Sequence, residues 1–334
     1  MILAGDIGGT NTRLALFDSA GGHFRQVSGS VFPSRQYSGL DEIVVKFVAA
    51  SKIHPSSACF GIAGPVQNGR VEATNLPWII EARRLADVLN LPDTLLINDV
   101  EASAWGIVTL NSQELVSLNK GRPNALGNQA VIAAGTGLGE AGLYWDGARH
   151  HVFATEGGHT DFGPTNDLEW ELMRYVRGIY DRVSYERILS GPGLVHIFDF
   201  LRETGRGTPA AWLREEMAQG DPAAAISRAG LDGKCGVAEQ ALDLFVVLYG
   251  REAANLVLKM KALGGVFLAG GIAPKILPKL TGPRFLNAYL DKGRMRPLLE
   301  ATPVQVIIND KLALVGAARC ATVNSPTREG SLAS

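Results

Sequence analysis

The sequence predicts an α/β protein built from two domains. Its 334 residues are enough for two domains of the usual size. Short apolar segments alternate with segments of helical spacing, which is the pattern of a mostly parallel sheet covered by helices. In addition, residues 6–16 can be laid over residues 135–145, since each segment places a glycine turn between two apolar strands. We therefore expect two related domains that face each other across a cleft.

The smaller domain is expected to begin at the N-terminus and to extend to about residue 110. Apolar runs bounded by glycine or polar turns predict its strands, and apolar residues at helical spacing predict its helices. The expected strands are 2–7, 13–17, Phe24–Ser30, Ala58–Ile62 and 94–97, and the expected helices are Leu40–Ala50 and Ile80–Leu89.

The pattern from about residue 165 to residue 260 is mainly helical. The expected helices are Leu168–Ile179, Leu194–Glu203, Ala210–Gln219 and Gly236–Lys261, followed by strands at 265–269 and Pro303–Ile308 and a helix at Leu312–Ala321. We assign residues 111–302 to the larger domain and expect the segment 303–321 to complete the smaller one. Residues 322–334 have little apolar content, which predicts a disordered tail.

The composition excludes several functional classes. The chain has 32 Lys and Arg against 33 Asp and Glu, a balance that argues against nucleic acid or an anionic membrane as a partner. The three cysteines, Cys59, Cys235 and Cys320, are far apart and predict neither a zinc site nor a disulfide framework. The N-terminus lacks the pattern of a signal peptide, and no apolar run is long enough for a membrane helix. We expect a cytoplasmic protein.

Glycine-rich turns at three places predict phosphate-binding loops: Asp6–Thr10, Gly135–Gly139 and Gly270-Gly271. A phosphate needs several converging backbone N–H groups, and glycine removes the side chains that would obstruct its approach. Thr10 and Thr136 add hydroxyl donors, and Asp6 is placed to orient a hydrated Mg²⁺. Either hairpin alone is better read as an ordinary glycine turn, and the phosphate reading depends on their occurrence together.

Two other nucleotide-binding signatures do not fit. A P-loop needs Gly-Lys followed by Ser or Thr, whereas Gly233-Lys234 is followed by Cys235. The dinucleotide pattern of spaced glycines occurs at 137–142, but its last glycine precedes a short strand where that motif requires a helix.

Two polar clusters are candidates for substrate chemistry. Asn98 and Asp99 end an apolar strand, where ligand sites of α/β sheets lie, and a carboxylate there can act as a general base. The alternative is that Asp99 only caps the following helix. Glu156, His159 and Glu186 suit the hydroxyls of a polyol, although they could also be solvated loop residues. We interpret the adjacent histidines at 150–151 as surface residues, since neighbours on a strand point to opposite faces.

Together these motifs resemble the bacterial glucokinases of the hexokinase/actin-like ATPase superfamily. Asp-Ile-Gly-Gly-Thr-Asn and Ala-Gly-Thr-Gly-Leu-Gly resemble the two phosphate motifs of the family, and Leu-Ala-Gly-Gly-Ile resembles its adenosine motif. Ile-Asn-Asp, Glu-Gly-Gly-His and Arg-Ile-Leu-Ser-Gly-Pro-Gly resemble further signatures, in the same order along residues 3–320. Residues 160–168 contain no cysteine, which places the chain with the zinc-free glucokinases.

The resemblance implies two ribonuclease-H-like domains around a central cleft, and an enzyme that uses ATP and Mg²⁺ to phosphorylate the 6-hydroxyl of glucose. It implies that Asp99 is the general base and that the sugar ligands are Asn75, Asn98, Asp99, Glu156, His159 and Glu186. The residues expected to bind ATP are Gly5, Asp6, Gly8, Gly9, Thr10, Asn11, Gly135, Thr136, Gly137, Gly270 and Gly271. We expect no metal site apart from Mg²⁺ bound through ATP, with a water near Asp6, and we expect a homodimer.

Some alternatives remain open on the residues alone. The sugar could be another hexose or an amino sugar, and the phosphoryl donor could be polyphosphate. An actin-like nucleotide switch that binds a protein partner is a competing class, but such a switch has no need of the Asn98-Asp99 and Glu156–His159 clusters. A sugar-responsive repressor would require a DNA-binding segment before Met1, and we expect none.

Overall fold

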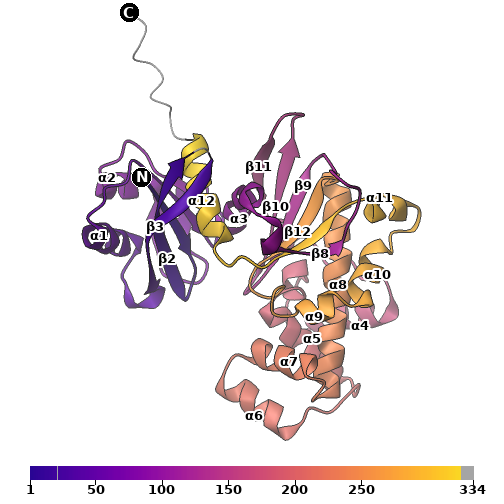
Figure 1. Ribbon diagram of the computed structural model, residues 1–334. Helices are drawn as coiled ribbons and strands as arrows, with labels where there is room; N and C mark the ends of the chain where they lie inside the picture. Colours follow the sequence, from indigo (N-terminus) through magenta and orange to yellow (C-terminus); the bar gives the residue numbers. More distant parts are fainter. Residues whose placement is uncertain (21, 325–334) are drawn as a thin grey trace, which may run out of the picture. The chain divides into compact units, whose positions relative to one another are not determined.

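The computed structural model describes residues 1–20 and 22–324, which form two compact units (Figure 1). Unit 1 contains residues 1–111 together with the C-terminal segment from Asn309 onward, and unit 2 contains residues 112–308. Each unit combines a twisted sheet with helices. The α/β class that the sequence predicts is therefore confirmed.

Unit 1 is organised by a five-stranded sheet with the order β3-β2-β1-β4-β7. The strands are β1 (Ile2–Ile7), β2 (Asn11–Ala20), β3 (His23–Pro33), β4 (Ser57–Ile62) and β7 (Leu95–Asn98). β1 pairs antiparallel with β2 and parallel with β4, and β4 pairs parallel with β7. The carboxyl ends of β1, β4 and β7 therefore lie along one edge of the sheet.

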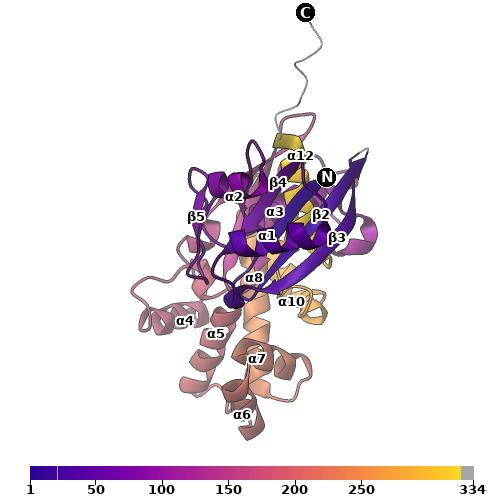
Figure 2. The ribbon, with the colours of Figure 1, turned by 90° about the vertical axis from the view of Figure 1, so that its left-hand side faces the viewer.

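Helices cover both faces of this sheet (Figure 2). The side chains of β1 alternate between two cores: Leu3 and Ile7 pack with α1 (Leu40–Ser51) and α2 (Ala82–Leu89), whereas Ile2 and Ala4 pack with α12 (Leu312–Asn324). α12 also packs on α3 (Asp99–Gly106), and a Cβ at Gly316 would overlap the carbonyl oxygen of Ala102. The small residues of the last helix are thus required by its close approach to α3.

Unit 2 is organised by a six-stranded sheet with the order β11-β10-β9-β12-β13-β8. The strands are β8 (Leu115–Asn119), β9 (Gln129–Ala134), β10 (Leu138–Trp145), β11 (His150–Thr155), β12 (Gly265–Ala269) and β13 (Val304–Ile307). β10 is antiparallel to β9 and β11, and β12 is parallel to β9 and β13. The first five strands of this order repeat the arrangement of unit 1, a hairpin meander followed by two parallel strands.

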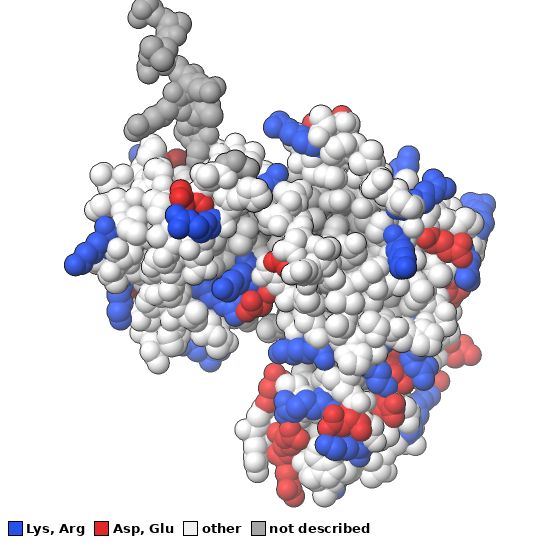
Figure 3. Space-filling view, in the orientation of Figure 1, with Lys and Arg blue, Asp and Glu red and all other residues white. Residues whose placement is uncertain are grey.

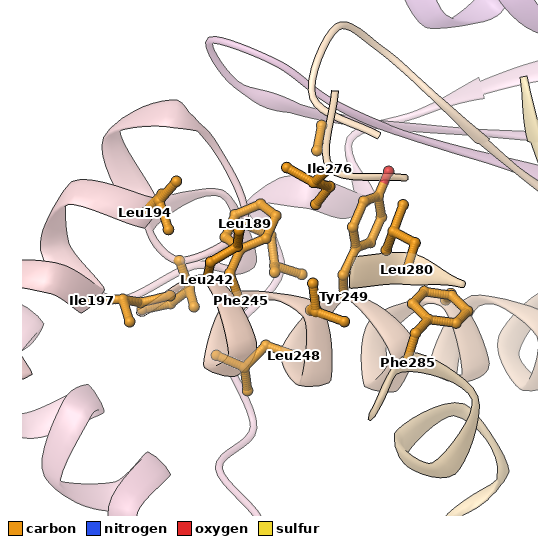
Figure 4. Packing of buried hydrophobic residues seen from close by; sticks show 14 of the residues in the cluster. Leu189, Leu194, Ile197, Leu242, Phe245, Leu248, Tyr249, Ile276, Leu280 and Phe285 are labelled. Atoms are coloured by element: carbon orange, nitrogen blue, oxygen red, sulfur yellow. The ribbon is translucent and has the colours of Figure 1, made fainter. Parts of the chain in front are cut away.

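A long helix, α8 (Gly236–Met260), forms the centre of the helical layer of unit 2. Phe245 and Tyr249 are fully buried against residues of α5 (Gly191–Glu203) and α10 (Pro283–Leu290) (Figure 4). The Tyr249 hydroxyl donates to the carbonyl oxygen of Ile132 at 3.3 Å. This bond satisfies the phenol while its ring stays in the core. The other helices are α4 (Asp167–Arg177), α5 (Gly191–Glu203), α6 (Ala211–Gln219), α7 (Pro222–Leu231), α9 (Leu277–Leu280), α10 (Pro283–Leu290) and α11 (Arg296–Glu300).

The structure corrects several expected boundaries. The strand expected at 303–308 does not complete the smaller domain, because β13 lies beside β12 in unit 2, with Val304 opposite Val266. The helix expected from Ile80 begins at Ala82, since residues 79–81 form β6, which pairs with β5 (Arg70–Glu72). α12 extends to Asn324, three residues into the expected tail, and residues 325–334 lie outside the described part.

The surface carries both signs of charge. On the face shown in Figure 3, basic and acidic side chains are interspersed over the helical part of unit 2, where ion pairs such as Arg228–Glu216 occur. Within residues 1–20 and 22–324, none of the helices is both long and apolar enough to cross a membrane.

Candidate active site

Asn98 and Asp99 lie at the junction of β7 and α3 in unit 1. Asn98 is the N-cap of α3: its Oδ1 accepts from the backbone N–H of Val100 at 2.9 Å, and its Nδ2 donates to the carbonyl oxygen of Gly64 at 3.2 Å. Asp99 is the first residue of α3, and its Oδ1 also accepts from Val100 at 2.9 Å. The alternative from the sequence was that Asp99 caps this helix, but the N-cap residue is Asn98.

Asn75 lies close to the first glycine turn. Its side chain packs so tightly on the turn that a Cβ at Gly9 would be 2.6 Å from the Cβ of Asn75. The preceding residue, Thr74, bonds to the carbonyl oxygen of Ala63 through its backbone N–H at 3.2 Å and its hydroxyl at 3.3 Å. Because Asn98 bonds to the neighbouring Gly64, the three sugar-binding candidates of unit 1 adjoin the ends of β1, β4 and β7.

Ser34 stabilises the first glycine turn, a role that was not predicted from the sequence. Its hydroxyl donates to the carbonyl oxygen of Gly8 at 2.8 Å, and its N–H donates to that of Thr10 at 2.9 Å. Within the turn, the N–H of Gly8 donates to the carbonyl oxygen of Asn11 at 3.0 Å. Gly5 lies within β1 before the turn, where a Cβ would be 2.5 Å from Phe60, so packing explains this glycine.

Asp6 is half-buried near the end of β1 in an acidic environment. Burial raises the pKa of Asp6 to about 6; the positive charge of Arg13 opposes this rise, whereas the carboxylates of Asp99 and Asp310 add to it. Arg13 also forms an ion pair with Asp310, with 3.8 Å between Nη1 of Arg13 and Oδ2 of Asp310. Excess negative charge around an oxygen donor suits a hydrated divalent cation. Within residues 1–20 and 22–324, these included, no group of three or more His, Cys, Asp or Glu side chains is arranged to hold a metal ion directly.

Glu156, His159 and Glu186 come together in unit 2. Glu156 directly precedes the short helix η4 (Gly157–His159), His159 is the last residue of η4, and Glu186 lies in η5 (Tyr185–Arg187). Nε2 of His159 is 3.9 Å from Oε2 of Glu156, and Nδ1 of His159 is 3.8 Å from Oε1 of Glu186. The imidazole therefore lies between the two carboxylates, and the three side chains present a compact set of donors and acceptors.

Glu186 is also bound to the second glycine turn. Its Oε2 accepts from the N–H of Leu138 at 3.1 Å, and a Cβ at Gly137 would be 2.5 Å from the same oxygen. The carbonyl oxygen of Glu186 accepts from the hydroxyl of Ser190 at 2.7 Å, and Ser190 is the N-cap of α5. A sugar-binding candidate thus adjoins the turn in this unit as well.

A cavity of about 510 Å³ is lined by the β8–β9 connection and α11, away from these residues, whereas a second cavity, of about 950 Å³, adjoins the turn itself. Gly135, Thr136 and Gly271 line the larger cavity, and α5 and α7 form its walls. The N–H of Gly191 at the start of α5 donates to the carbonyl oxygen of Gly135 at 2.8 Å. Gly270, with a φ of +81°, makes the sharp turn after β12 that only glycine adopts easily.

The α7 wall of this cavity was not anticipated from the sequence. Its residues include Asp221, Ser227 and Arg228, from a segment where we expected no helix. The signal was present, however, because Asp221 caps the N-terminus of α7 and Pro222 occupies the first turn.

Comparisons with known proteins identify the family of the chain. The family model described as glucokinase matches residues 3–324. A glucokinase from a Nostoc species is 43% identical, over 96% of this chain and 98% of its own. The crystal structure of a glucokinase from an Antarctic psychrotroph has a TM-score of 0.83 at 32% identity, covering 96% of this chain and 98% of that one. The glucokinase of Streptomyces griseus shares the fold, with a TM-score of 0.67 at 23% identity, 96% of this chain and 99% of that chain being covered. This chain belongs to the glucokinase family.

Proposed function

We propose that the chain transfers the γ-phosphoryl group of ATP to the 6-hydroxyl of glucose, with Asp99 as the general base. The observation that carries the proposal is the match to the glucokinase family over residues 3–324. Asp99 directly follows β7, and ligand sites in α/β sheets usually lie at the carboxyl ends of the strands. The glucokinase of Streptomyces griseus was crystallised with glucose and AMPPNP, which supports the same pair of substrates here.

The carboxylate of Asp99 would act on the attacking hydroxyl. Phosphoryl transfer depends mainly on positioning and on charge stabilisation, and a primary alcohol is a poor nucleophile. A carboxylate within about 3 Å of that hydroxyl can orient it and accept its proton as the new bond forms. The first-turn position in α3 and the bond to Val100 restrict the carboxylate to few orientations, which favours this role.

Each unit carries side chains suited to glucose recognition. Glu156 and Glu186 would accept hydrogen bonds from ring hydroxyls, and His159 between them would donate or accept. In unit 1, Asn75 and Asn98 would supply amide groups. A sugar that lacks a matching hydroxyl would leave one of these polar groups without a partner, and the resulting loss of affinity would provide selectivity.

The cavity lined by Gly135, Thr136 and Gly271 would hold the nucleotide in unit 2. The first turn, Gly8 to Thr10, would contact phosphate oxygens through backbone N–H groups. Asp6 would contact Mg²⁺ through water, since its carboxylate lies in an environment with excess negative charge. When bound, Mg²⁺ supplies positive charge that offsets the charge of the phosphates.

A coupled assay of phosphoryl transfer tests the proposal. Purified protein is assayed with a panel of hexoses and amino sugars, and with ATP or polyphosphate as the donor. We expect the highest kcat/KM with glucose and ATP. A clear preference for an amino sugar, or activity that depends on polyphosphate, would overturn the proposed substrates. Product analysis by ³¹P NMR distinguishes the 6-phosphate from other positions.

A further inference from the structure

We propose that Glu140 is a positioning residue for glucose binding: its buried carboxyl group, beneath Gly157, supports the loop from Glu156 to His159. The inference rests on the proposed sugar-binding role of that loop. It concerns a pair of buried glutamates that takes no part in the chemistry described above.

Glu140 lies directly under the sugar loop. It is on β10, opposite Thr155, and only 2% of its surface is exposed. A Cβ at Gly157 would overlap Oε2 of Glu140, so the loop backbone rests on this carboxyl group. The Thr155 hydroxyl donates to the carbonyl oxygen of Glu140 at 2.9 Å and accepts from the N–H of Gly157 at 3.2 Å. The start of the loop is therefore held by the backbone and the side chain of Glu140.

Glu252 connects Glu140 to the second sugar-binding segment. It is fully buried on α8, where its Oε1 accepts from Lys259 at 2.9 Å and its Oε2 accepts from Asn255 at 2.8 Å. Asn255 also donates to the hydroxyl of Tyr185 at 2.9 Å. Tyr185 immediately precedes Glu186, so the same network lies behind both segments that carry the sugar-binding candidates.

The pair is stable only while one of its carboxyls keeps a proton. Two ionised carboxylates cannot form a hydrogen bond with each other, and the single ammonium of Lys259 cannot neutralise both charges. Burial and the charge of Glu252 raise the pKa of Glu140 to about 8, against the opposing effect of Lys259. Oε1 of Glu140 has no hydrogen-bond partner among residues 1–20 and 22–324. A proton on Glu140 supplies the donor that Glu252 can accept.

Other titratable groups also face the pair. α8 contributes Lys259 and Tyr249, η5 contributes Tyr185, and the segment after α10 contributes Lys292. Burial raises the pKa of both tyrosines, so they keep their protons in the range where Glu140 titrates. Burial lowers the pKa of Lys292, whose Nζ donates to Asn255 at 2.6 Å. The test must therefore separate Glu140 from Lys292.

Glucose affinity as a function of pH makes that separation. The dissociation constant of glucose is measured by isothermal titration from pH 6.5 to pH 9.5 without nucleotide. If only the protonated form of Glu140 supports the loop, the constant of the wild type rises about tenfold between pH 7 and pH 9. Glu140→Gln removes the titrating proton but keeps a donor, so its glucose affinity should resemble that of the wild type at pH 7 and should lose this rise.

Two further variants complete the design. Glu252→Gln removes the charge that raises the pKa of Glu140, so the rise should move to lower pH. Glu169→Gln is the matched control: Glu169 is equally buried in unit 2, but it bonds to Thr165 and Asn166 away from the sugar loop. This variant should keep the wild-type rise of the glucose dissociation constant with pH. A changed profile in Glu169→Gln would show that a general loss of stability, and not the proton of Glu140, causes the change.

Three results would overturn the inference: a flat wild-type profile, an unchanged rise in Glu140→Gln, or an unmoved rise in Glu252→Gln. Glu252→Gln decides the question if Glu140→Gln does not fold. Failure of the proposed sugar site would look different, because Glu156→Gln and Glu186→Gln would then bind glucose as the wild type does. If those two variants lose affinity while Glu140→Gln keeps the wild-type rise, only the inference about Glu140 fails.

Discussion

The two units share a scaffold but differ in what is attached to it. Both sheets begin with a hairpin meander and continue with two parallel strands. In each unit, a glycine of the glycine turn packs on a sugar-binding candidate: Gly9 on Asn75 in unit 1, and Gly137 on Glu186 in unit 2. The proposed phosphate-binding turn and a proposed sugar ligand therefore pack against each other in both units.

The connection after the meander accounts for the main difference. In unit 1, residues 34–56 link β3 to β4 and contain one α-helix, α1. In unit 2, residues 156–264 link β11 to β12 and contain α4 to α8, including α5 and α7, which line the proposed nucleotide cavity. The feature that belongs to unit 1 alone in this comparison is the acidic environment of Asp6. A duplicated scaffold can thus be specialised by the length of one connection and by the residues at its strand ends.

The largest expected effect tests the role of Asp99 in unit 1. Asp99→Asn should lower kcat at least about a hundredfold, the usual contribution of a general base, while glucose affinity changes little. An asparagine can still accept from Val100, so α3 should remain capped. Steady-state kinetics together with isothermal titration of glucose provide the measurement.

Asp167→Asn provides the matched control for that experiment. Asn166 and Asp167 start α4 as Asn98 and Asp99 start α3, with the side chain of Asn166 as the N-cap. The control loses the same charge at the same helical position and should keep kcat within about twofold of the wild type. If Asp99→Asn behaves like this control, Asp99 has only a capping role.

The next effect tests the sugar-binding candidates of unit 2. In Glu186→Gln, a charged acceptor becomes a neutral one, and hydrogen bonds to charged groups are worth about 1.5–3 kcal/mol against about 1 kcal/mol. The dissociation constant of glucose should rise roughly tenfold, while that of ATP stays within about twofold. Glu203→Gln, on the exposed end of α5, should change neither affinity. Unchanged glucose binding in Glu186→Gln would remove this residue from the site.

A pair of alanine substitutions separates the two functions of one turn. In Gly137→Ala, the new Cβ would displace the Glu186 carboxylate, so we expect a loss of about 1 kcal/mol, or roughly fivefold, in glucose affinity. In Gly135→Ala, no atom lies within 4 Å of the new Cβ, but the residue lines the nucleotide cavity. This variant should weaken ATP binding and spare glucose. Equal effects of both variants on both ligands would contradict the separation.

Local patterns predicted most of the secondary structure but not the register of the repeat. The strand before the glycine turn ends at Ile7 in β1 and at Ala134 in β9. Counted from these residues, Gly8 corresponds to Gly135, whereas the alignment of residues 6–16 with residues 135–145 had matched Gly8 to Gly137. A shift of two residues keeps each side chain on the same face of a strand, so the apolar pattern did not reveal the error.

Features that depend on contacts between residues far apart in the sequence were not predicted. The Pro303–Ile308 strand was placed in the wrong domain, because an apolar run does not specify which strand it will pair with. Ser34 and Glu140 make contacts that form only in the tertiary fold. A single polar residue gives no periodic signal in the sequence. By contrast, the site motifs consist of contiguous residues at strand ends, where the sequence itself marks the break from apolar to polar.

The smallest expected effect concerns stability and the acidic end of unit 1. Because burial raises the pKa of Asp6 to about 6, from 3.8, the folded protein binds this proton more tightly than the unfolded chain does. The stability gained from that proton is complete below the unfolded pKa and is lost as the pH rises through about 4 to 6. Asp6→Asn should therefore raise the melting temperature of the free protein by a few degrees at pH 7.5, corresponding to about 1–3 kcal/mol, and should have little effect at pH 4. Differential scanning fluorimetry across this range measures the difference, with Asp18→Asn at a half-exposed position of β2 as a charge-matched control. Equal melting temperatures of Asp6→Asn and wild type at both pH values would show that the carboxylate is not destabilising, and the argument for a cation beside it would lose its basis.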